Sequence, residues 1–100
     1  MPPIRTRTHP GAVLREKYLR PLGVSANAFA RAIRVAPNRI TAIVADDNPR
    51  AASPDPALRL ARYFRTTPEF WLNLQTAYDL SVARQQIGAT IEAKVRPIAA

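Results

Sequence analysis

Residues 28–44 read AFARAIRVAPNRITAIV, in which two short runs of helical spacing are separated by a few residues. Pro37 marks the start of the second run, because the first position of a helix needs no backbone donor. Two helices that cross steeply need a small residue inside the first and apolar residues in the turn and the second. The stretch supplies such a set: Phe29, Ala30, Ile33, Val35, Ile40 and Ile43. The pattern predicts a helix-turn-helix motif.

Arg34 is the one departure from this pattern, because glycine is common where the tight turn begins. A left-handed backbone at an arginine costs about 1 kcal/mol, which the packing around it must offset. An ordinary helical hairpin within a small bundle is therefore the alternative interpretation of the same residues.

Further helices are expected on both sides of the motif. The first follows Pro10 and stops at Pro21, which has no backbone donor. Ser25 can cap the first helix of the motif, because its hydroxyl can accept from a free amide of the first turn. A fourth helix is expected after the turn-rich stretch DDNPRAASPDP. Its candidate caps are Ser53 and Asp55, and its expected apolar face carries Leu58, Ala61 and Phe64.

The fifth and longest expected helix begins at Pro68, where Thr67 can cap it and Glu69 favours the helix dipole. We expect Gly88 to end this helix. The aromatic residues along the last two helices have helical spacing, which favours a core over a base-stacking platform. They are Tyr63, Phe64, Phe70, Trp71 and Tyr78. Residues 89–96, TIEAKVRP, fit either a short helix or a strand.

The whole pattern predicts a compact all-α domain of five helices, because no strand pair with a hairpin signal is present. We expect a flexible basic arm at residues 1–9 and the helix-turn-helix domain at 10–86. Residues 87–100 form an expected C-terminal extension, either partly disordered or in contact with a second copy. A chain of 100 residues has room for one small core and no second domain.

The charge of the chain points to a polyanionic partner. Its 15 Lys and Arg residues against 7 Asp and Glu residues give a net charge of +8, which favours nucleic acid but also fits ribosomal and membrane-surface proteins. No apolar run approaches the roughly 18 residues of a membrane span. The segment MPPIRTRTHPG lacks the apolar continuation of a signal peptide. We therefore expect a cytoplasmic protein that does not bind membranes.

Residues for catalysis and for metal or cofactor binding are sparse. The chain has no cysteine, and its single histidine, His9, is expected to shape the start of the first helix. No glycine-rich phosphate loop or clustered carboxylate pair is present. Asp46 and Asp47 have no histidine or further acid nearby, so we interpret them as loop residues rather than metal ligands. We expect no enzyme activity, no cofactor and no metal.

The second helix of the motif is expected to enter the major groove of double-stranded DNA with its first turn. Arg39 can donate two hydrogen bonds to guanine, and Asn38 can form a bidentate contact with adenine. A solvated arginine or a phosphate contact is the alternative interpretation of Arg39. The candidate base contacts are Pro37, Asn38, Arg39, Thr41 and Ala42.

Candidate contacts to the DNA backbone flank these residues. Ser25 and Asn27 lie at the start of the first motif helix, where amides and short polar side chains can hold a phosphate. Asn48 and Arg50 follow the second motif helix and can hold the adjoining backbone. Arg5 and Arg7 fit either an arm in the minor groove or a solvated tail. Two-fold symmetry would let a dimer read an inverted repeat.

Three stretches resemble the HigA-type antitoxins, a branch of the Xre-like regulators: HPGAVLREKYLRPLGVSANAFARAI, APNRITAIV and DPALRLARYFRTTPEFWLNLQTAYDL. The most specific part is PEFWLNLQTAYDL, which separates this branch from generic phage-repressor-like domains. The resemblance implies a five-helix lambda-repressor-like core, a homodimer and an operator in the chain's own promoter. It also implies a HigB-like toxin partner that cleaves translated messenger RNA. The recognition positions of the family correspond to Asn38, Arg39 and Thr41.

Two alternatives to this function remain open. A stand-alone Xre-like repressor would bind DNA without a toxin. An interaction module would cover an acidic toxin with its basic surface and have little specific DNA affinity. The surfaces for the dimer and the toxin are not implied by the resemblance, because members of the family differ in them.

Overall fold

The computed structural model describes residues 7–99, and this part of the chain is all-α. Its helices form five continuous segments: α1 (Pro10–Val13) with the π-helical η1 (Leu14–Leu19) and α2 (Arg20–Leu22); α3 (Ala26–Ala32); α4 (Pro37–Ile43); α5 (Pro54–Phe64); and α6 (Pro68–Ala83) with the π-helical η2 (Arg84–Gly88) and α7 (Ala89–Lys94). The predicted five-helix fold class is confirmed.

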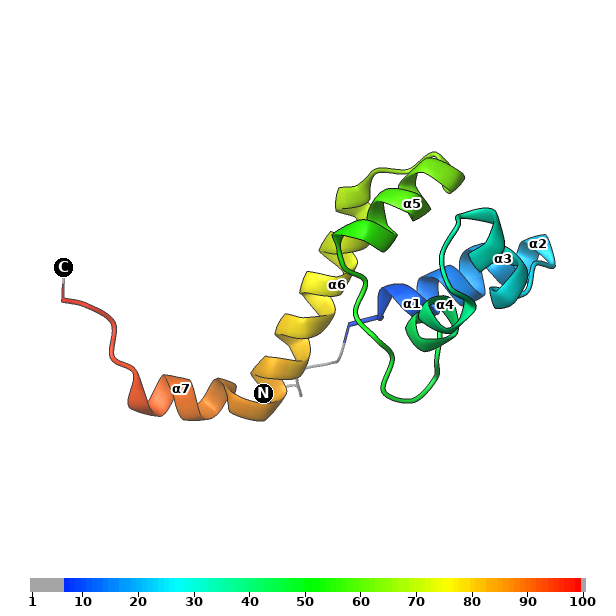
Figure 1. Cartoon of the computed structure of the whole chain (residues 1–100). Coiled ribbons are helices and arrows are strands. Elements are labelled where there is room, and N and C mark those ends of the chain that lie inside the picture. The colour runs from blue at the N-terminus through cyan, green and yellow to red at the C-terminus, as the bar shows by residue number, and fades with distance from the viewer. Residues whose placement is uncertain (1–6, 100) are drawn as a thin grey trace.

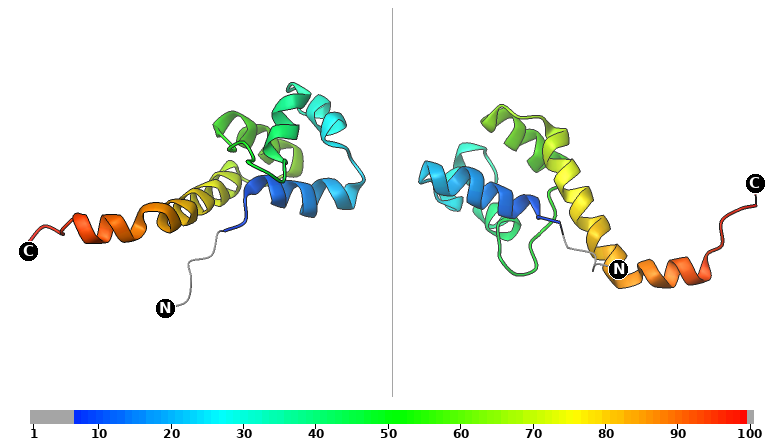
Figure 2. Two further views of the ribbon diagram at one scale, coloured as in Figure 1. Left: turned by 90° about the horizontal axis from the view of Figure 1, so that it is seen from below. Right: turned by 180° about the vertical axis from the view of Figure 1, so that it is seen from behind.

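The first four helical segments and the start of α6 pack together, whereas the end of the chain projects away from them (Figures 1 and 2). The Cα radius of gyration is 16.5 Å and the long axis measures 53 Å. A compact domain of this length has a radius of gyration of about 13 Å. The difference reflects the projecting segment, in which α7 and the residues after it contact little else (Figure 2).

The first helical segment passes through Pro21 and ends only at Gly23, so the predicted stop at Pro21 is wrong. The wider turns of η1 precede the proline, and the Arg20 amide donates to the carbonyl of Arg15, five residues back. A π-helical turn of this kind can accommodate the missing donor of Pro21. Gly23 then takes the left-handed conformation, with φ 67°, that ends a helix.

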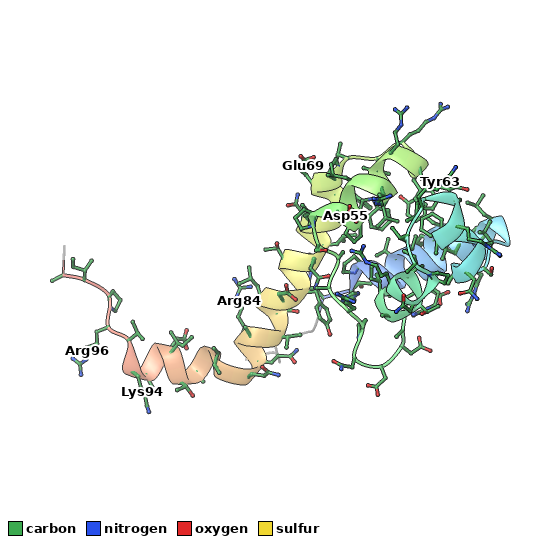
Figure 3. The ribbon with its side chains drawn as sticks, in the orientation of Figure 1. Asp55, Tyr63, Glu69, Arg84, Lys94 and Arg96 are labelled. Atoms are coloured by element: carbon green, nitrogen blue, oxygen red, sulfur yellow. The ribbon has the colours of Figure 1, made fainter. Side chains whose placement is uncertain are left out.

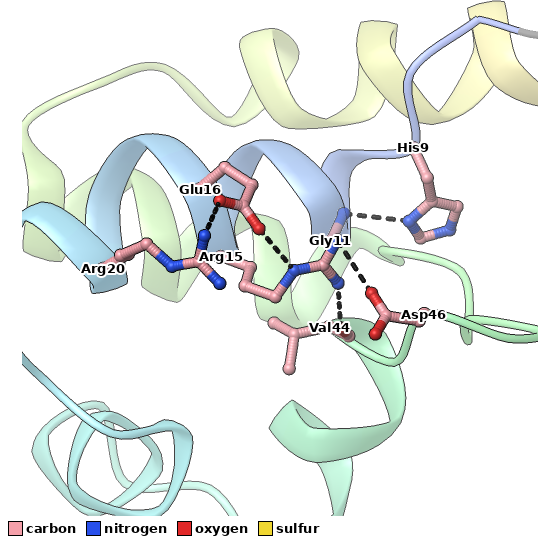
Figure 4. Close-up of polar contacts among 7 residues, drawn as sticks. All are labelled: His9, Gly11, Arg15, Glu16, Arg20, Val44 and Asp46. Atoms are coloured by element: carbon pink, nitrogen blue, oxygen red, sulfur yellow. Dashed lines mark hydrogen bonds and ion pairs between the residues drawn. The ribbon is translucent and has the colours of Figure 1, made fainter.

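Gly11 lets the first helix lie directly against the end of α4. A Cβ atom at this position would lie 1.8 Å from the carbonyl oxygen of Ile43, so a side chain has no room. The same junction is held by Arg15, whose guanidinium donates to the Val44 carbonyl and pairs with Asp46 at 3.1 Å (Figure 4). The first helix thus fixes the carboxyl end of α4 both by close packing and by charge.

One apolar core joins all five helical segments. Trp71 of α6 is fully buried, and its indole N–H donates to the Thr66 hydroxyl at 2.9 Å, which satisfies the one polar atom of the ring. Phe29 of α3 stacks on Phe64 of α5 with ring centroids 5.3 Å apart. The buried members of the core are Leu14, Leu19, Phe29, Ala30, Ile33, Ile40, Ala57, Leu60 and Trp71.

Two parts of the predicted core differ from the structure. Leu58 is 60% exposed, whereas Ala61 is buried and Phe64 packs against the core as predicted. Ala57 and Leu60 take the buried positions on α5 that were not predicted. Apolar positions spaced three residues apart drift around a helix of 3.6 residues per turn, so Leu58 falls away from the face that Ala61 and Phe64 share with the core. Tyr63 and Phe70 cover the rim of the core rather than filling it, with exposures of 45% and 39%.

The last helical segment continues beyond Gly88, so the predicted helix end at Gly88 is wrong. Gly88 has helical backbone angles, φ −57° and ψ −48°, and lies between η2 and α7. Glycine ends a helix where it adopts a left-handed conformation, which Gly88 does not. The ambiguous segment after it is a helix, which Val95 ends with an extended backbone.

Candidate nucleic-acid interface

The α3 and α4 helices are joined by a tight turn that begins at Arg34. Arg34 has φ 64°, the left-handed conformation that the pattern requires at this position. The amide of Val35 then donates to the carbonyl of Ala30 at 3.0 Å, which closes the end of α3. Pro37 occupies the first turn of α4 as expected.

A contact across 25 residues of sequence supports the strained turn. The guanidinium of Arg59, on α5, donates to the carbonyl of Ile33 at 2.8 Å and to that of Arg34 at 3.3 Å. These carbonyls lie at the end of α3, where a helix leaves acceptors without partners inside the helix. Arg59 thus offsets part of the cost of a non-glycine residue in the turn. Its role could not be predicted from the sequence, because its two carbonyl partners lie 26 and 25 residues away.

The α4 helix has one buried and one exposed face. Ile40 and Ile43 are buried, with exposures of 1% and 3%. The opposite face begins at the free amino end of the helix and carries the candidate base contacts. Pro37, Asn38 and Thr41 are exposed there, and Arg39 and Ala42 are partly exposed.

Small polar contacts order this exposed face. The Thr41 hydroxyl donates to the carbonyl of Asn38 at 3.2 Å, which holds the threonine side chain against its own helix. Arg39 lies near Asp55, the acid in the first turn of α5, with 3.6 Å between Nη1 and Oδ2. The face therefore presents an amide, a guanidinium and a methyl-bearing hydroxyl within one turn of helix.

The candidate backbone contacts lie at two ends of the motif. Ser25 and Asn27 are exposed at the start of α3, where the Ser25 hydroxyl caps the helix by accepting from the Ala28 amide at 3.1 Å. Asn48 and Arg50 are exposed in the loop after α4. The Arg50 amide donates to the carbonyl of Ala42 at 2.9 Å, so this loop folds back on the end of α4.

The structure describes residues 7–9 of the basic segment that precedes the first helix. Arg5 lies outside the described residues. Arg7 is exposed, and its amide donates to the hydroxyl of Ser81 on α6 at 2.9 Å. Ser81 is buried and in turn donates to the carbonyl of Tyr78 at 2.7 Å. The backbone of the segment is therefore attached to α6 at Arg7.

His9 caps the first helix, as the sequence indicated. Its Nδ1 accepts from the Gly11 amide at 2.9 Å (Figure 4). Its ring meets Tyr78 edge to face, with ring centroids 4.8 Å apart. Burial of the imidazole lowers the pKa of His9, and the nearby Asp79 carboxylate opposes this shift. The neutral ring is the form that can accept at Nδ1.

Residues 7–99 meet the requirements of neither a metal site nor a membrane span. No group of three or more histidine, cysteine, aspartate or glutamate side chains lies close enough to hold a metal ion. Asp46 and Asp47 are both exposed in the loop after α4, and Asp46 also pairs with Arg15 at 3.1 Å. In the same part of the chain, every helix is too short or too polar to cross a membrane.

Gln75 is a structural residue that was missed from the sequence. It is buried on α6, where its carbonyl oxygen accepts from the Ala52 amide at 2.7 Å and its amide group donates to Asp79 at 2.9 Å. These bonds attach the loop between α4 and α5 to α6. Its spacing in the sequence could have revealed this role, because Gln75 follows Trp71 by four residues and therefore lies on the same face of the helix.

Known proteins with similar sequences include virulence-associated proteins, uncharacterised helix-turn-helix transcriptional regulators and an antitoxin. Virulence-associated protein I of Dichelobacter nodosus is 53% identical over 77 residues, which are 77% of this chain and 69% of that protein. Antitoxin HigA-1 of Vibrio cholerae is 36% identical over 70% of this chain and 64% of that protein. No protein-family model matches the chain.

Solved structures extend the similarity to the whole fold. Pseudomonas aeruginosa antitoxin HigA, in a structure with the higBA promoter, has a TM-score of 0.88 and 39% identity over 95% of this chain and all of that one. This chain belongs to the HigA family of helix-turn-helix antitoxins. Antitoxin GraA in complex with its operator also has a TM-score of 0.88, with 43% identity over all of this chain and 99% of its own. The family suggested by the sequence is confirmed.

Proposed function

We propose that this member of the HigA family binds an operator in its own promoter by inserting the first turn of α4 into the major groove. The observation that carries the proposal is the solvent-facing side of α4, where Asn38 and Thr41 are exposed and Arg39 is partly exposed on a helix whose other face is buried. The similar structures with a promoter and an operator support it. The side chains have the donor and acceptor groups that base edges require.

The proposed roles follow from the chemistry of each side chain. Arg39 reads guanine with two donors, and Asn38 reads adenine with its amide. Ala42 and the Thr41 methyl contact a thymine methyl group, while Pro37 packs beside the adjoining backbone. A net charge of +8 supplies the attraction to DNA that does not depend on sequence.

The phosphate contacts are proposed at the ends of the motif. Ser25 uses its hydroxyl oxygen as a cap and so keeps its proton free to donate to a phosphate. Asn27 lies beside it, and Asn48 and Arg50 hold the backbone on the other side of the groove. Arg5 and Arg7 supply a basic arm whose contacts are independent of sequence.

We propose that residues 10–86 form the DNA-binding domain and that the C-terminal extension joins two copies. The extension carries Ile87, Ile91 and Val95, spaced four residues apart and exposed by 50%, 47% and 61%. Burying these half-exposed apolar side chains against the same face of a second copy would stabilise the pair. A two-fold dimer doubles the length of DNA read, which one short helix cannot specify alone.

The proposed protein partner is a HigB-like toxin, which the family membership supports. Such a chain acts by binding rather than by catalysis, and it acts in the cytoplasm, where its DNA lies. A toxin-like reading frame beside the coding region is the first test of this part. Copurification of the two products supports the antitoxin role, and failure of the coexpressed chains to associate leaves the stand-alone repressor.

The DNA-binding proposal is tested by titration at fixed salt concentration. The probes are the DNA upstream of the coding region and a scrambled duplex of equal length, because electrostatic affinity depends strongly on salt. We expect the upstream DNA to bind at least a hundredfold more tightly than the scrambled duplex, a modest ratio for a specific regulator. Equal, salt-sensitive binding to both would contradict the proposal and favour an interaction module.

A further inference from the structure

Within residues 7–99, Asp55 is the one acidic side chain that lies within ion-pair distance of Arg39. Its Oδ2 lies 3.6 Å from Nη1 of Arg39, which is within ion-pair range but beyond hydrogen-bond distance. The two side chains come from different helices, α4 and α5. The carboxylate therefore attracts one end of the guanidinium without occupying its donors.

Asp55 is itself fixed from its other side. The Nε of Arg59 lies 3.3 Å from each of its two carboxylate oxygens. Arg59 is in turn anchored on the carbonyls of Ile33 and Arg34. The orientation of the carboxylate is thus tied to the turn of the helix-turn-helix motif. Figure 3 labels Asp55 at the start of α5.

Stability does not account for this arrangement. The side chains of Asp55 and Arg39 are 51% and 39% exposed, and an ion pair this exposed contributes between zero and about 1 kcal/mol. An acid in the first turn of α5 favours the helix dipole, but that effect does not require Arg39 to lie beside it. A carboxylate next to a DNA-binding face also repels phosphates, which is a cost to affinity.

We propose that Asp55 is a specificity-determining positioning residue, which orients the Arg39 guanidinium so that its free donors meet guanine. The inference rests on the proposed function, because it assumes that α4 reads bases. An arginine with four rotatable bonds loses less freedom on binding when a fixed carboxylate has already selected its direction. The carboxylate therefore lowers the affinity for all DNA through repulsion of phosphates, and it raises the preference for guanine at one position.

The test is selection from a randomised duplex library, with sequencing of the bound DNA, for the wild-type chain and for Asp55→Asn. We expect the guanine preference at the position read by Arg39 to fall about fivefold in Asp55→Asn, the lower end of what one bidentate contact contributes. Preferences at the other positions are expected to remain. Asp47→Asn is the matched control, because it removes the same charge from an exposed loop residue.

The double variant with Arg39→Ala separates orientation from a structural effect. In that background Asp55→Asn should change no base preference further. Losses at several positions in both backgrounds would show that Asp55 acts through Arg59 and the turn, and would overturn the inference. An unchanged motif in Asp55→Asn, with binding to all DNA raised as in Asp47→Asn, would also overturn it.

The same experiment distinguishes this failure from failure of the proposed function. If the wild-type chain enriches no motif at all, base reading by α4 is wrong, and the role of Asp55 falls with it. If the wild-type chain enriches a motif that Asp55→Asn leaves intact, base reading stands and only the role of Asp55 is wrong. Thermal unfolding of each variant confirms that the chains compared are folded.

Discussion

The helix-turn-helix part of the molecule and its C-terminal helix differ in what holds them in place. The α3 and α4 helices are fixed by buried apolar residues, by Gly11 against Ile43, and by the Arg59 contacts to the turn. The α7 helix has no buried residue, and its apolar side chains lie in solvent. The comparison teaches that the helix-turn-helix part is held by contacts within the chain, whereas the C-terminal helix has few such contacts and, in the proposal above, packs against a second copy.

The comparison predicts that substitutions in the apolar core, against which α3 and α4 pack, lower the stability of the fold most strongly. Trp71→Ala should lower the free energy of unfolding by about 3 to 5 kcal/mol, because it removes a fully buried ring. Chemical denaturation measures this loss. Phe70→Ala is the matched control, since Phe70 is 39% exposed and should cost clearly less. Equal losses for the two variants would mean that burial does not distinguish them.

Gly11→Ala probes the closest contact in the helix-turn-helix part. The added Cβ would overlap the Ile43 carbonyl and push the first helix from α4, at a cost of about 3 kcal/mol. Gly88→Ala is the control, because its Cβ would have ordinary contacts and alanine favours a helix. We expect the melting temperature to fall for Gly11→Ala and to stay or rise for Gly88→Ala. The reverse order would contradict the packing described.

The C-terminal helix should respond in association rather than in folding. The double change Ile87→Glu and Ile91→Glu should weaken dimerisation at least tenfold, because burying two isoleucines contributes several kcal/mol. Sedimentation measures the dimer, and the helical core should keep its stability within about 0.5 kcal/mol. Gln86→Glu with Thr90→Glu places the same charges one residue earlier on the helix. If both pairs of changes weaken the dimer equally, the apolar stripe is not the contact.

The smallest expected effect is a pH dependence at His9. Its pKa is lowered in the folded chain, so the unfolded chain binds the proton more readily. The stabilising contribution of His9 is complete above its ordinary pKa of about 6.5 and is lost as pH falls through the lower folded value. Denaturation series between pH 8 and 5 measure the loss, which His9→Asn should remove while keeping a side-chain cap. An identical pH profile in both chains would contradict this role.

Much of the helix-turn-helix part could be predicted from local rules. Apolar spacing, the Ser25 and Thr67 caps and the turn at Arg34 are properties of neighbouring residues, and the structure contains each of them. The contacts of Arg59 and Gln75 could not be predicted, because each joins segments more than 20 residues apart. The predicted helix end at Gly88 was wrong for a related reason, since glycine ends a helix only where its surroundings favour a left-handed turn.

In the candidate site, too, the residues on one helix could be predicted, whereas a contact between two helices could not. The residues on the exposed face of α4 follow from helical spacing once the helix is placed. The pairing of Arg39 with Asp55 depends on how α5 crosses α4, which the sequence does not display.

The most direct test of the central claim compares Arg39→Ala with Arg62→Ala in titrations of upstream and scrambled DNA. Both changes remove one positive charge, but Arg39 lies on α4 and Arg62 on α5. Arg39→Ala should lose about 1 to 3 kcal/mol on the upstream DNA and little on the scrambled duplex, whereas Arg62→Ala should affect both alike. Equal losses on both duplexes for Arg39→Ala would contradict base reading by α4.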